Sequence, residues 1–342
     1  LVGSEMCIRD RVVGEKQDKK LGVPCRIYAP VGNHETLLAY LVRRLLENGA
    51  NTSFVNRIAD KSLAIDDLIE NPTQTILSSA KRENIVGQKH LSIPLPAELY
   101  GQLRANSKGL DLANDSALVQ LNQTAQQFAK HQWSAAPMGE HIQTNDAVAP
   151  QSIINPARHS DVVGYVQEAT TEQVEQALNN AQAVQDIWAR TAKDTRASYL
   201  LRAADLMEAR LEELMVLLCR ESGKTYANAI AEVREAVDFL RYYATQMIDL
   251  DANAEVEPLG TMLCISPWNF PLAIFTGQVA AALVAGNTVI AKPAEQTPLI
   301  AAQAIQILWQ AGVPQAAVQL MPGRGETVGA QLSAAEQVQG IM

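Results

Sequence analysis

The stretch TMLCISPWNFPLAIFTGQVAAALVAGNTVIAK, residues 261–292, decides the fold of this chain. It holds two short apolar runs that read as strands, separated by an apolar segment long enough for a helix. The same alternation continues, and the predicted order is strand 261–266, helix 272–285, strand 288–292, helix 299–311, strand 318–321 and a helix from Glu326. Strands that alternate with helices at this spacing imply right-handed crossovers and a parallel sheet. The sequence therefore predicts an α/β domain.

The residues upstream of this stretch are mainly helical in pattern. Two strand-like runs come first, and long amphipathic segments follow them. The predicted elements are strands 152–155 and 162–169, then helices 171–188, 194–221 and 227–249. At the other end of the chain, residues 340–342 read as the start of a further buried strand.

The composition indicates a folded protein and disfavours several kinds of partner. The 342 residues, 47% apolar and 19% charged, are enough for two or more domains with buried cores. A net charge of −9 disfavours nucleic acid as a partner, so no nucleic-acid site is expected in this chain. The four cysteines lie far apart, and no Cys/His cluster has metal-ligand spacing. We therefore expect no metal site and a reducing, cytoplasmic location.

The segments that follow the predicted strands carry chemistry suited to a nucleotide. Asn269 comes just after the first strand, and its amide could donate to a developing oxyanion or simply cap the next helix. Lys292 and Glu295 follow the second strand and could hold ribose hydroxyls. The run GRGETVG at 323–329 opens a helix whose N–H groups favour phosphates, although its GxGxxxG spacing is a weak fingerprint.

A second group of residues lies near the start of the sequence. The run RIYAPVG at 26–32 reads as a strand and a turn, and the predicted helix after it carries Arg43 and Arg44. Two adjacent guanidiniums suit two-point binding of a carboxylate. From spacing alone, however, a solvated face of salt bridges is the favoured interpretation.

The exact residues of this group are more informative than their spacing. The runs RIYAPVGNHE (26–35) and YLVRRLLENG (40–49) strongly resemble the last barrel strand and helix of the proline dehydrogenase domain in the proline utilization A family. The resemblance implies that Arg43 and Arg44 bind the proline carboxylate and that Tyr28 packs on the proline ring. It places three residues on the FAD side of that site, namely Glu47, Ser53 and Phe54. Such a (β/α)8 barrel needs eight strands, and only the last strand-helix unit is recognised here.

The strand-end segments resemble a second family. In order and spacing, CISPWNFP (264–271), AKPAEQTP (291–298) and GRGETVG (323–329) closely resemble the nicotinamide domain of the aldehyde dehydrogenase superfamily. The resemblance implies that Asn269 is the oxyanion-hole amide. It also implies NAD rather than NADP, because the carboxylate of Glu295 would repel a 2′-phosphate. The implied cofactor-binding residues are Ser266, Pro267, Trp268, Lys292, Glu295, Gly325 and Gly329.

The upstream motif ESGKT, residues 221–225, is part of the same resemblance. Its GKT ending is similar to a phosphate-binding loop, but Leu218 stands where that loop requires its first glycine. We therefore assign no nucleotide contact to this motif. The superfamily's catalytic cysteine and general-base glutamate are expected beyond Met342, and none of the four cysteines is a substitute.

The two resemblances together imply a bifunctional enzyme of proline catabolism. FAD-dependent oxidation of proline would give pyrroline-5-carboxylate, and NAD-dependent oxidation of glutamate semialdehyde would give glutamate. Quinone would accept the flavin electrons, which implies peripheral contact at the inner membrane. The resemblance also implies a cytoplasmic homodimer. The predicted parts are a non-native leader (1–10), the end of the barrel (11–59), a mainly helical connecting arm (60–145) and the truncated N-terminal portion of the aldehyde dehydrogenase domain (146–342).

The chain alone is expected to be inactive, and two alternatives stay open. One is a non-catalytic fragment that serves as a partial nucleotide-binding or dimerisation module. The other is a single-function NAD-dependent aldehyde dehydrogenase with an N-terminal extension.

Overall fold

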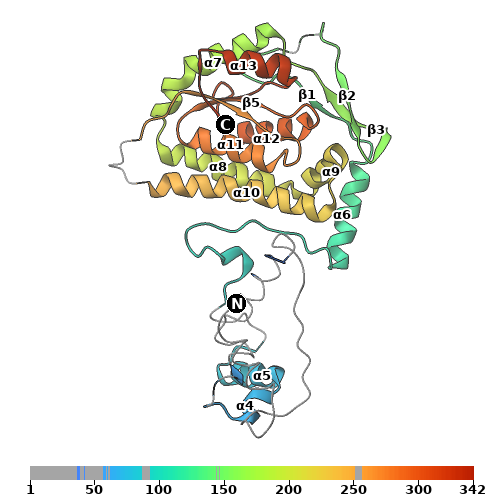
Figure 1. Ribbon diagram of the computed structural model, residues 1–342, viewed down its shortest axis with the longest axis vertical. Helices are drawn as coiled ribbons and strands as arrows, with labels where there is room; N and C mark the ends of the chain where they lie inside the picture. Colours follow the sequence, from blue (N-terminus) through green and yellow to red (C-terminus); the bar gives the residue numbers. More distant parts are fainter. Residues whose placement is uncertain are drawn as a thin grey trace. The chain divides into compact units, whose positions relative to one another are not determined.

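The computed structural model describes part of the chain, which divides into two compact units, residues 1–88 and 89–342. The described residues are 37, 38, 42, 57, 58, 60, 62–86, 93–143, 145, 147–250 and 256–342 (Figure 1). Most of the predicted strand-helix unit of the barrel therefore lies outside the described residues. So do the six residues assigned to it by resemblance: Tyr28, Arg43, Arg44, Glu47, Ser53 and Phe54.

The described part of the first unit is helical. It contains α4 (Ile65–Ile69) and α5 (Pro72–Arg82). Helix α5 starts where the sequence provides both a cap and a stiff first residue: the Asn71 side chain accepts a hydrogen bond from the Thr73 backbone N–H at 2.9 Å, and Pro72 opens the helix. The predicted connecting arm of 60–145 extends beyond this unit, and its limits stay a prediction.

The second unit is built on a four-stranded parallel sheet. Its strands are β4 (Thr261–Ile265), β5 (Thr288–Lys292), β6 (Val318–Leu320) and β7 (Val338–Ile341), in the order β6-β5-β4-β7. The predicted α/β domain with a parallel sheet is confirmed. The last strand is not buried as predicted, because it lies at the edge of the sheet and alternates between half-buried and exposed residues.

Helices cover both faces of this sheet (Figure 1). On one face lie α11 (Ala273–Val284) and α12 (Pro298–Ala311), and on the other lie α7 (Thr171–Arg190) and α13 (Ala330–Ala334). Strand residues alternate between the two cores, as a pleated strand requires. Leu263, Ile290 and Met321 pack with α7, whereas their neighbours along the strands pack with α11 and α12.

A further helical layer packs on α11 and α12. It consists of α8 (Lys193–Ala209), α9 (Leu211–Ser222) and α10 (Tyr226–Asp249). The prediction of one helix over 194–221 is wrong, since the chain leaves helical geometry at Arg210, with φ −102° and ψ 18°. The Arg210 guanidinium is held there by Glu213 at 2.6 Å and by Gln303 of α12 at 2.6 Å.

Buried glutamates cap the two helices that follow the strand ends. Neither α11 nor α12 has a side-chain cap from its own N-cap residue. For α12, the Glu221 carboxylate accepts from the backbone N–H of Leu299 at 2.6 Å and of Ile300 at 2.9 Å. For α11, the Glu232 carboxylate accepts from the backbone N–H of Leu272 at 2.8 Å and of Ala273 at 3.3 Å. The two glutamates thus accept hydrogen bonds from the free amides at the start of each helix.

A smaller sheet completes the unit. It contains β1 (Trp133–Ala135), β2 (Gln151–Asn155) and β3 (Arg158–Val166), in the order β1-β3-β2. The strand predicted at 162–169 starts earlier and ends at Val166, because β2 and β3 form a hairpin and Thr170 is already the N-cap of α7. Within the described residues, no helix has the length and apolar character needed to cross a membrane.

Candidate functional site

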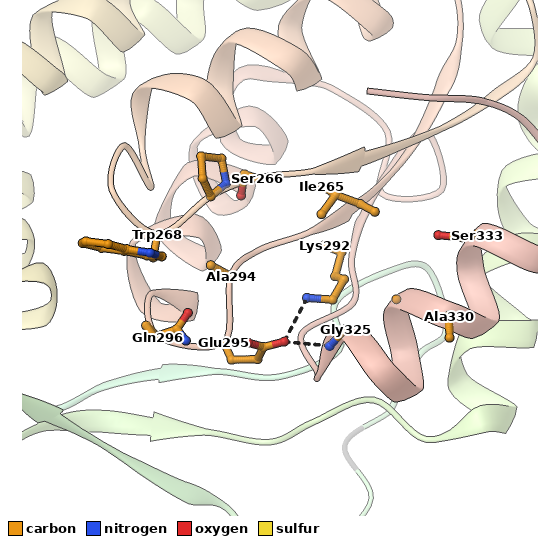
Figure 2. A pocket seen from close by; sticks show the side chains of 12 residues that line it. Ile265, Ser266, Trp268, Lys292, Ala294, Glu295, Gln296, Gly325, Ala330 and Ser333 are labelled. Carbon is orange, nitrogen blue, oxygen red and sulfur yellow. Dashed lines mark hydrogen bonds and ion pairs between the residues drawn. The ribbon is translucent and has the colours of Figure 1, made fainter.

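A cleft of about 490 Å³ opens where β4 and β5 end. Its walls are the turns after these two strands and the helical turn η3 (Gly325–Gly329) that leads into α13 (Figure 2). All seven residues implied as cofactor-binding line it: Ser266, Pro267, Trp268, Lys292, Glu295, Gly325 and Gly329. Ligands of parallel α/β sheets bind outside the carboxyl ends of the strands, which is the position of this cleft.

Lys292 is the buried cation of the cleft. Its side chain is only 4% exposed, and its Nζ donates to the carbonyl of Pro293 at 3.0 Å. Burial lowers the pKa of the Lys292 ammonium below its ordinary value, and the nearby carboxylate of Glu295 opposes this effect. The floor of the cleft therefore holds a poorly solvated ammonium whose ion-pair partner, Glu295, lies 3.7 Å away.

Glu295 links Lys292 to the glycine-rich turn. One oxygen, Oε1, lies 3.7 Å from Lys292 Nζ and accepts the backbone N–H of Gly325 at 2.7 Å (Figure 2). The side chain is 40% exposed, so part of the carboxylate faces solvent. Such a group can exchange a backbone partner for a ligand hydroxyl at low cost.

The glycine-rich turn approaches Lys292 closely. The helix predicted from Glu326 is confirmed, but its first turn is the wider π type, and α13 follows it. A Cβ placed at Gly329 would meet Lys292 Cε at 3.3 Å, which is a tight contact. The small residue at 329 therefore leaves the room that the lysine side chain occupies.

The turn after β4 forms the opposite wall. The Ser266 backbone N–H donates to the Lys292 carbonyl at 3.2 Å, which joins the two strand ends. Its hydroxyl oxygen is buried, and none of the residues that the structure describes forms a hydrogen bond with it. Trp268 is 59% exposed and presents its indole at the rim. A buried hydroxyl without a partner beside a cleft fits a polar ligand group that would satisfy it.

Asn269 does not line this cleft. It is exposed in the turn after Trp268, and its carbonyl accepts a hydrogen bond from Lys224 Nζ at 2.8 Å. The interpretation that Asn269 caps the next helix is wrong, because the amides at the start of α11 bind Glu232 instead. The side-chain amide of Asn269 therefore has no hydrogen-bond partner among the described residues.

Sequence reasoning missed two sets of residues. Five further cleft residues were not predicted: Ile265, Ala294, Gln296, Ala330 and Ser333. Most lie beside or one turn from a predicted residue, so strand-end position and helical spacing could have indicated them. Lys224 and Glu232 could not be found in this way, because both are distant in sequence from the groups they contact. Lys224 lies in the link before α10 and contacts Asn269. Glu232 lies in α10 and contacts the start of α11.

The donor set of the cleft matches the groups of a dinucleotide. A cation and a carboxylate are suited to ribose hydroxyls, and an unpaired hydroxyl and a glycine-rich helical turn are suited to polar ligand atoms at close range. With a doubly covered parallel sheet beneath it, this arrangement defines a Rossmann-like α/β domain with an open cleft at its strand ends.

Comparison with known proteins identifies the family. The sequence model of the aldehyde dehydrogenase family matches residues 142–342, and that of proline dehydrogenase matches residues 7–57. The chain therefore belongs to the aldehyde dehydrogenase family.

Curated relatives extend this result. The bifunctional protein PutA of Escherichia coli is 59% identical over 97% of this chain, which corresponds to 25% of the relative. The PutA of Rhizobium meliloti is 51% identical over 94%. A 1-pyrroline-5-carboxylate dehydrogenase of Anoxybacillus flavithermus is 38% identical over 64% of the chain and 44% of the relative. The chain thus spans about a quarter of the length of its PutA relatives, and the resemblance to the proline utilization A family is confirmed.

Solved structures agree with this assignment. Proline utilization A from Bdellovibrio bacteriovorus, inactivated by N-propargylglycine, has a TM-score of 0.67 at 31% identity and covers 94% of this chain and 33% of its own. The 1-pyrroline-5-carboxylate dehydrogenase from Thermus with bound NAD has a TM-score of 0.65 at 30% identity, covering 74% of this chain and 50% of its own.

Proposed function

We propose that residues 146–342 supply the NAD site of an aldehyde dehydrogenase that oxidises glutamate semialdehyde to glutamate. The observation that carries the proposal is that the seven residues named by the resemblance all line one cleft. Lys292 and Glu295 would bind hydroxyls of the adenosine ribose, and Ser266, Gly325 and Gly329 would receive the rest of the dinucleotide at close range. Bound NAD would accept the hydride from the substrate.

Asn269 has a separate part in this proposal. Its exposed amide would donate to the oxyanion that forms when the aldehyde carbonyl is attacked, because such a donor stabilises negative charge in the transition state. Trp268, next to it, would line the cofactor cleft. Glu295 would favour NAD over NADP through repulsion of a 2′-phosphate.

We further propose that the whole protein is a bifunctional enzyme of proline catabolism. In that case Tyr28, Arg43 and Arg44 would bind proline, and Glu47, Ser53 and Phe54 would lie beside FAD. Proline would be oxidised to pyrroline-5-carboxylate, with quinone as the electron acceptor of a homodimer that contacts the inner membrane peripherally. The match of PutA proteins over 97% of the chain supports this proposal.

The extent of the matches favours the bifunctional enzyme over a single-function dehydrogenase. The 1-pyrroline-5-carboxylate dehydrogenase relatives align with 56–64% of the chain, whereas PutA relatives align with 94–97%. The proline dehydrogenase match at residues 7–57 lies in the part that PutA adds.

The experiment is an assay of the protein expressed from its complete gene. We expect it to reduce a quinone analogue with proline and to reduce NAD with glutamate semialdehyde. Activity with the aldehyde alone would support the single-function alternative. The absence of both activities in a folded, FAD-loaded protein would support the non-catalytic module.

A further inference from the structure

The link between α9 and α10 fixes one lysine in space. Helix α9 is followed by its C-cap residue Gly223, which has the left-handed φ of 69° that favours glycine. Helix α10 begins after Thr225, whose side chain caps the helix by accepting the Asn228 N–H at 3.3 Å. Lys224 stands alone between a helix C-cap and a helix N-cap. Its backbone direction is therefore set on both sides.

The Lys224 ammonium joins two parts of the protein. Its Nζ lies 2.8 Å from Glu232 Oε2 and donates to the Asn269 carbonyl at 2.8 Å. It also lies 4.7 Å from the ring centroid of Phe270, over its face. The lysine side chain is 13% exposed and that of Glu232 is fully buried. Little solvent screening is therefore left at this ion pair.

Glu232 extends the same network to the far end of the turn. Its other oxygen accepts the backbone N–H of Leu272 at 2.8 Å and of Ala273 at 3.3 Å. The segment from Asn269 to Ala273 is thus held at its entry by the lysine and at its exit by the carboxylate.

The network restrains the backbone of Asn269 and leaves its side chain free. None of the residues that the structure describes forms a hydrogen bond with the Asn269 amide, and the residue is exposed. A fixed backbone with a free donor is the arrangement that a preorganised site requires.

We propose that Lys224 is a positioning residue that aims the Asn269 amide at the reacting carbonyl oxygen, with Glu232 as its anchor. This inference rests on the proposed role of Asn269. An oxyanion donor acts in proportion to how well it is already placed when charge develops, and a displacement of about 1 Å is enough to lose about 100-fold in rate. In this proposal Lys224 of the ESGKT motif (221–225) acts through Asn269 and binds no phosphate.

The test is a double-mutant cycle on aldehyde oxidation by the protein expressed from its complete gene. The variants are Lys224→Met, Asn269→Ala and the two combined, with Lys224→Arg as the conservative variant. Lys130→Met is the control, since Lys130 is an exposed lysine on the surface after α6 (Asp115–Gln127). The readouts are kcat, KM for the aldehyde and the Kd for NAD. Melting temperatures report the fold.

We expect Asn269→Ala to lower kcat about 100-fold. Lys224→Met should lower kcat at least about tenfold with the Kd for NAD unchanged, and Lys224→Arg should restore part of it. The combined variant should be no slower than Asn269→Ala alone, because a lysine that acts through the amide has nothing to position once the amide is gone. A purely structural lysine would instead give multiplied losses.

Each other outcome overturns a distinct statement. If Asn269→Ala keeps full kcat, the proposed role of Asn269 fails and the inference falls with it. If Asn269→Ala is slow but Lys224→Met is as fast as the wild type, or its loss multiplies with that of Asn269→Ala, the inference alone is wrong. Should Lys224→Met fail to fold because Glu232 is left buried without a counter-charge, the charge-balanced variant Lys224→Met/Glu232→Gln replaces it in the cycle.

Discussion

Lys292 Nζ lies 3.7 Å from Glu295 Oε1, at the point where β5 gives way to the turn before α12. The two groups differ in their access to solvent, since the lysine is buried and the glutamate is partly exposed. In the proposed complex both would bind one ribose, with the ammonium at the floor of the cleft and the carboxylate at its solvent-exposed side. Their separate substitution should therefore have different consequences for affinity and for stability.

Substitution Glu295→Gln should relax the choice between NAD and NADP. The charged acceptor for the ribose hydroxyls is lost, which weakens NAD binding about tenfold, and the repulsion of a 2′-phosphate disappears. Titration calorimetry with both dinucleotides measures the ratio of the two Kd values. Glu336→Gln, at an exposed position near the C-terminus, is the control. An unchanged ratio would remove Glu295 from the ribose site.

Substitution Lys292→Met should weaken NAD binding while raising stability. Burial lowers the pKa of this lysine, so its charged form is disfavoured in the folded state. The penalty grows as pH falls from the ordinary pKa of 10.5 to the lowered folded pKa, and it is complete below that value. Methionine keeps the side-chain length without the charge. At neutral pH we expect a gain of about 1 kcal/mol in the free energy of unfolding and a loss of about tenfold in NAD affinity. Urea unfolding and calorimetry test the two parts, and tighter NAD binding by the variant would contradict the account.

Glu221 should make the free energy of unfolding decrease as pH rises from 4.5 to about 8. Burial, and to a lesser extent the charge of Glu232, raise the pKa of its carboxyl from the ordinary 4.5 to about 8, against the opposing effect of two backbone N–H bonds. A raised folded pKa means that the folded state holds the proton more tightly, so this contribution is complete below 4.5 and is lost as pH rises to about 8. Relative to Glu221→Gln, which stays neutral, the wild type should lose stability over that range. Parallel stability curves for the two proteins would show that the carboxyl is ionised throughout.

The sequence is informative about elements that depend on local pattern. The strands around Leu263 and Ile290 could be predicted because apolar runs of strand length alternate with helical segments, and Lys292 and Glu295 could be placed because carboxyl ends of parallel strands share one edge. The break at Arg210 could not, since no glycine or proline marks it and the Arg210 side chain there binds Gln303 of α12, which is distant in sequence.

Long-range contacts account for what was missed in the site as well. Lys224 and Glu232 act on a turn about 40 residues away in sequence, and Glu221 caps a helix 78 residues further on. No periodicity within a helix reveals which carboxylate will meet the first amides of another helix. Only the packed arrangement of α9 and α10 against α11 and α12 brings these groups together.

The most direct measurement for the proposed cofactor site is a crystal structure of this chain grown with NAD. We expect the adenosine ribose in the cleft, with its hydroxyls within hydrogen-bond distance of Lys292 Nζ and the Glu295 carboxylate, and with the dinucleotide passing the turn that begins at Gly325. NAD bound elsewhere on the chain, with Lys292 and Glu295 still paired only to each other and to the backbone, would contradict it.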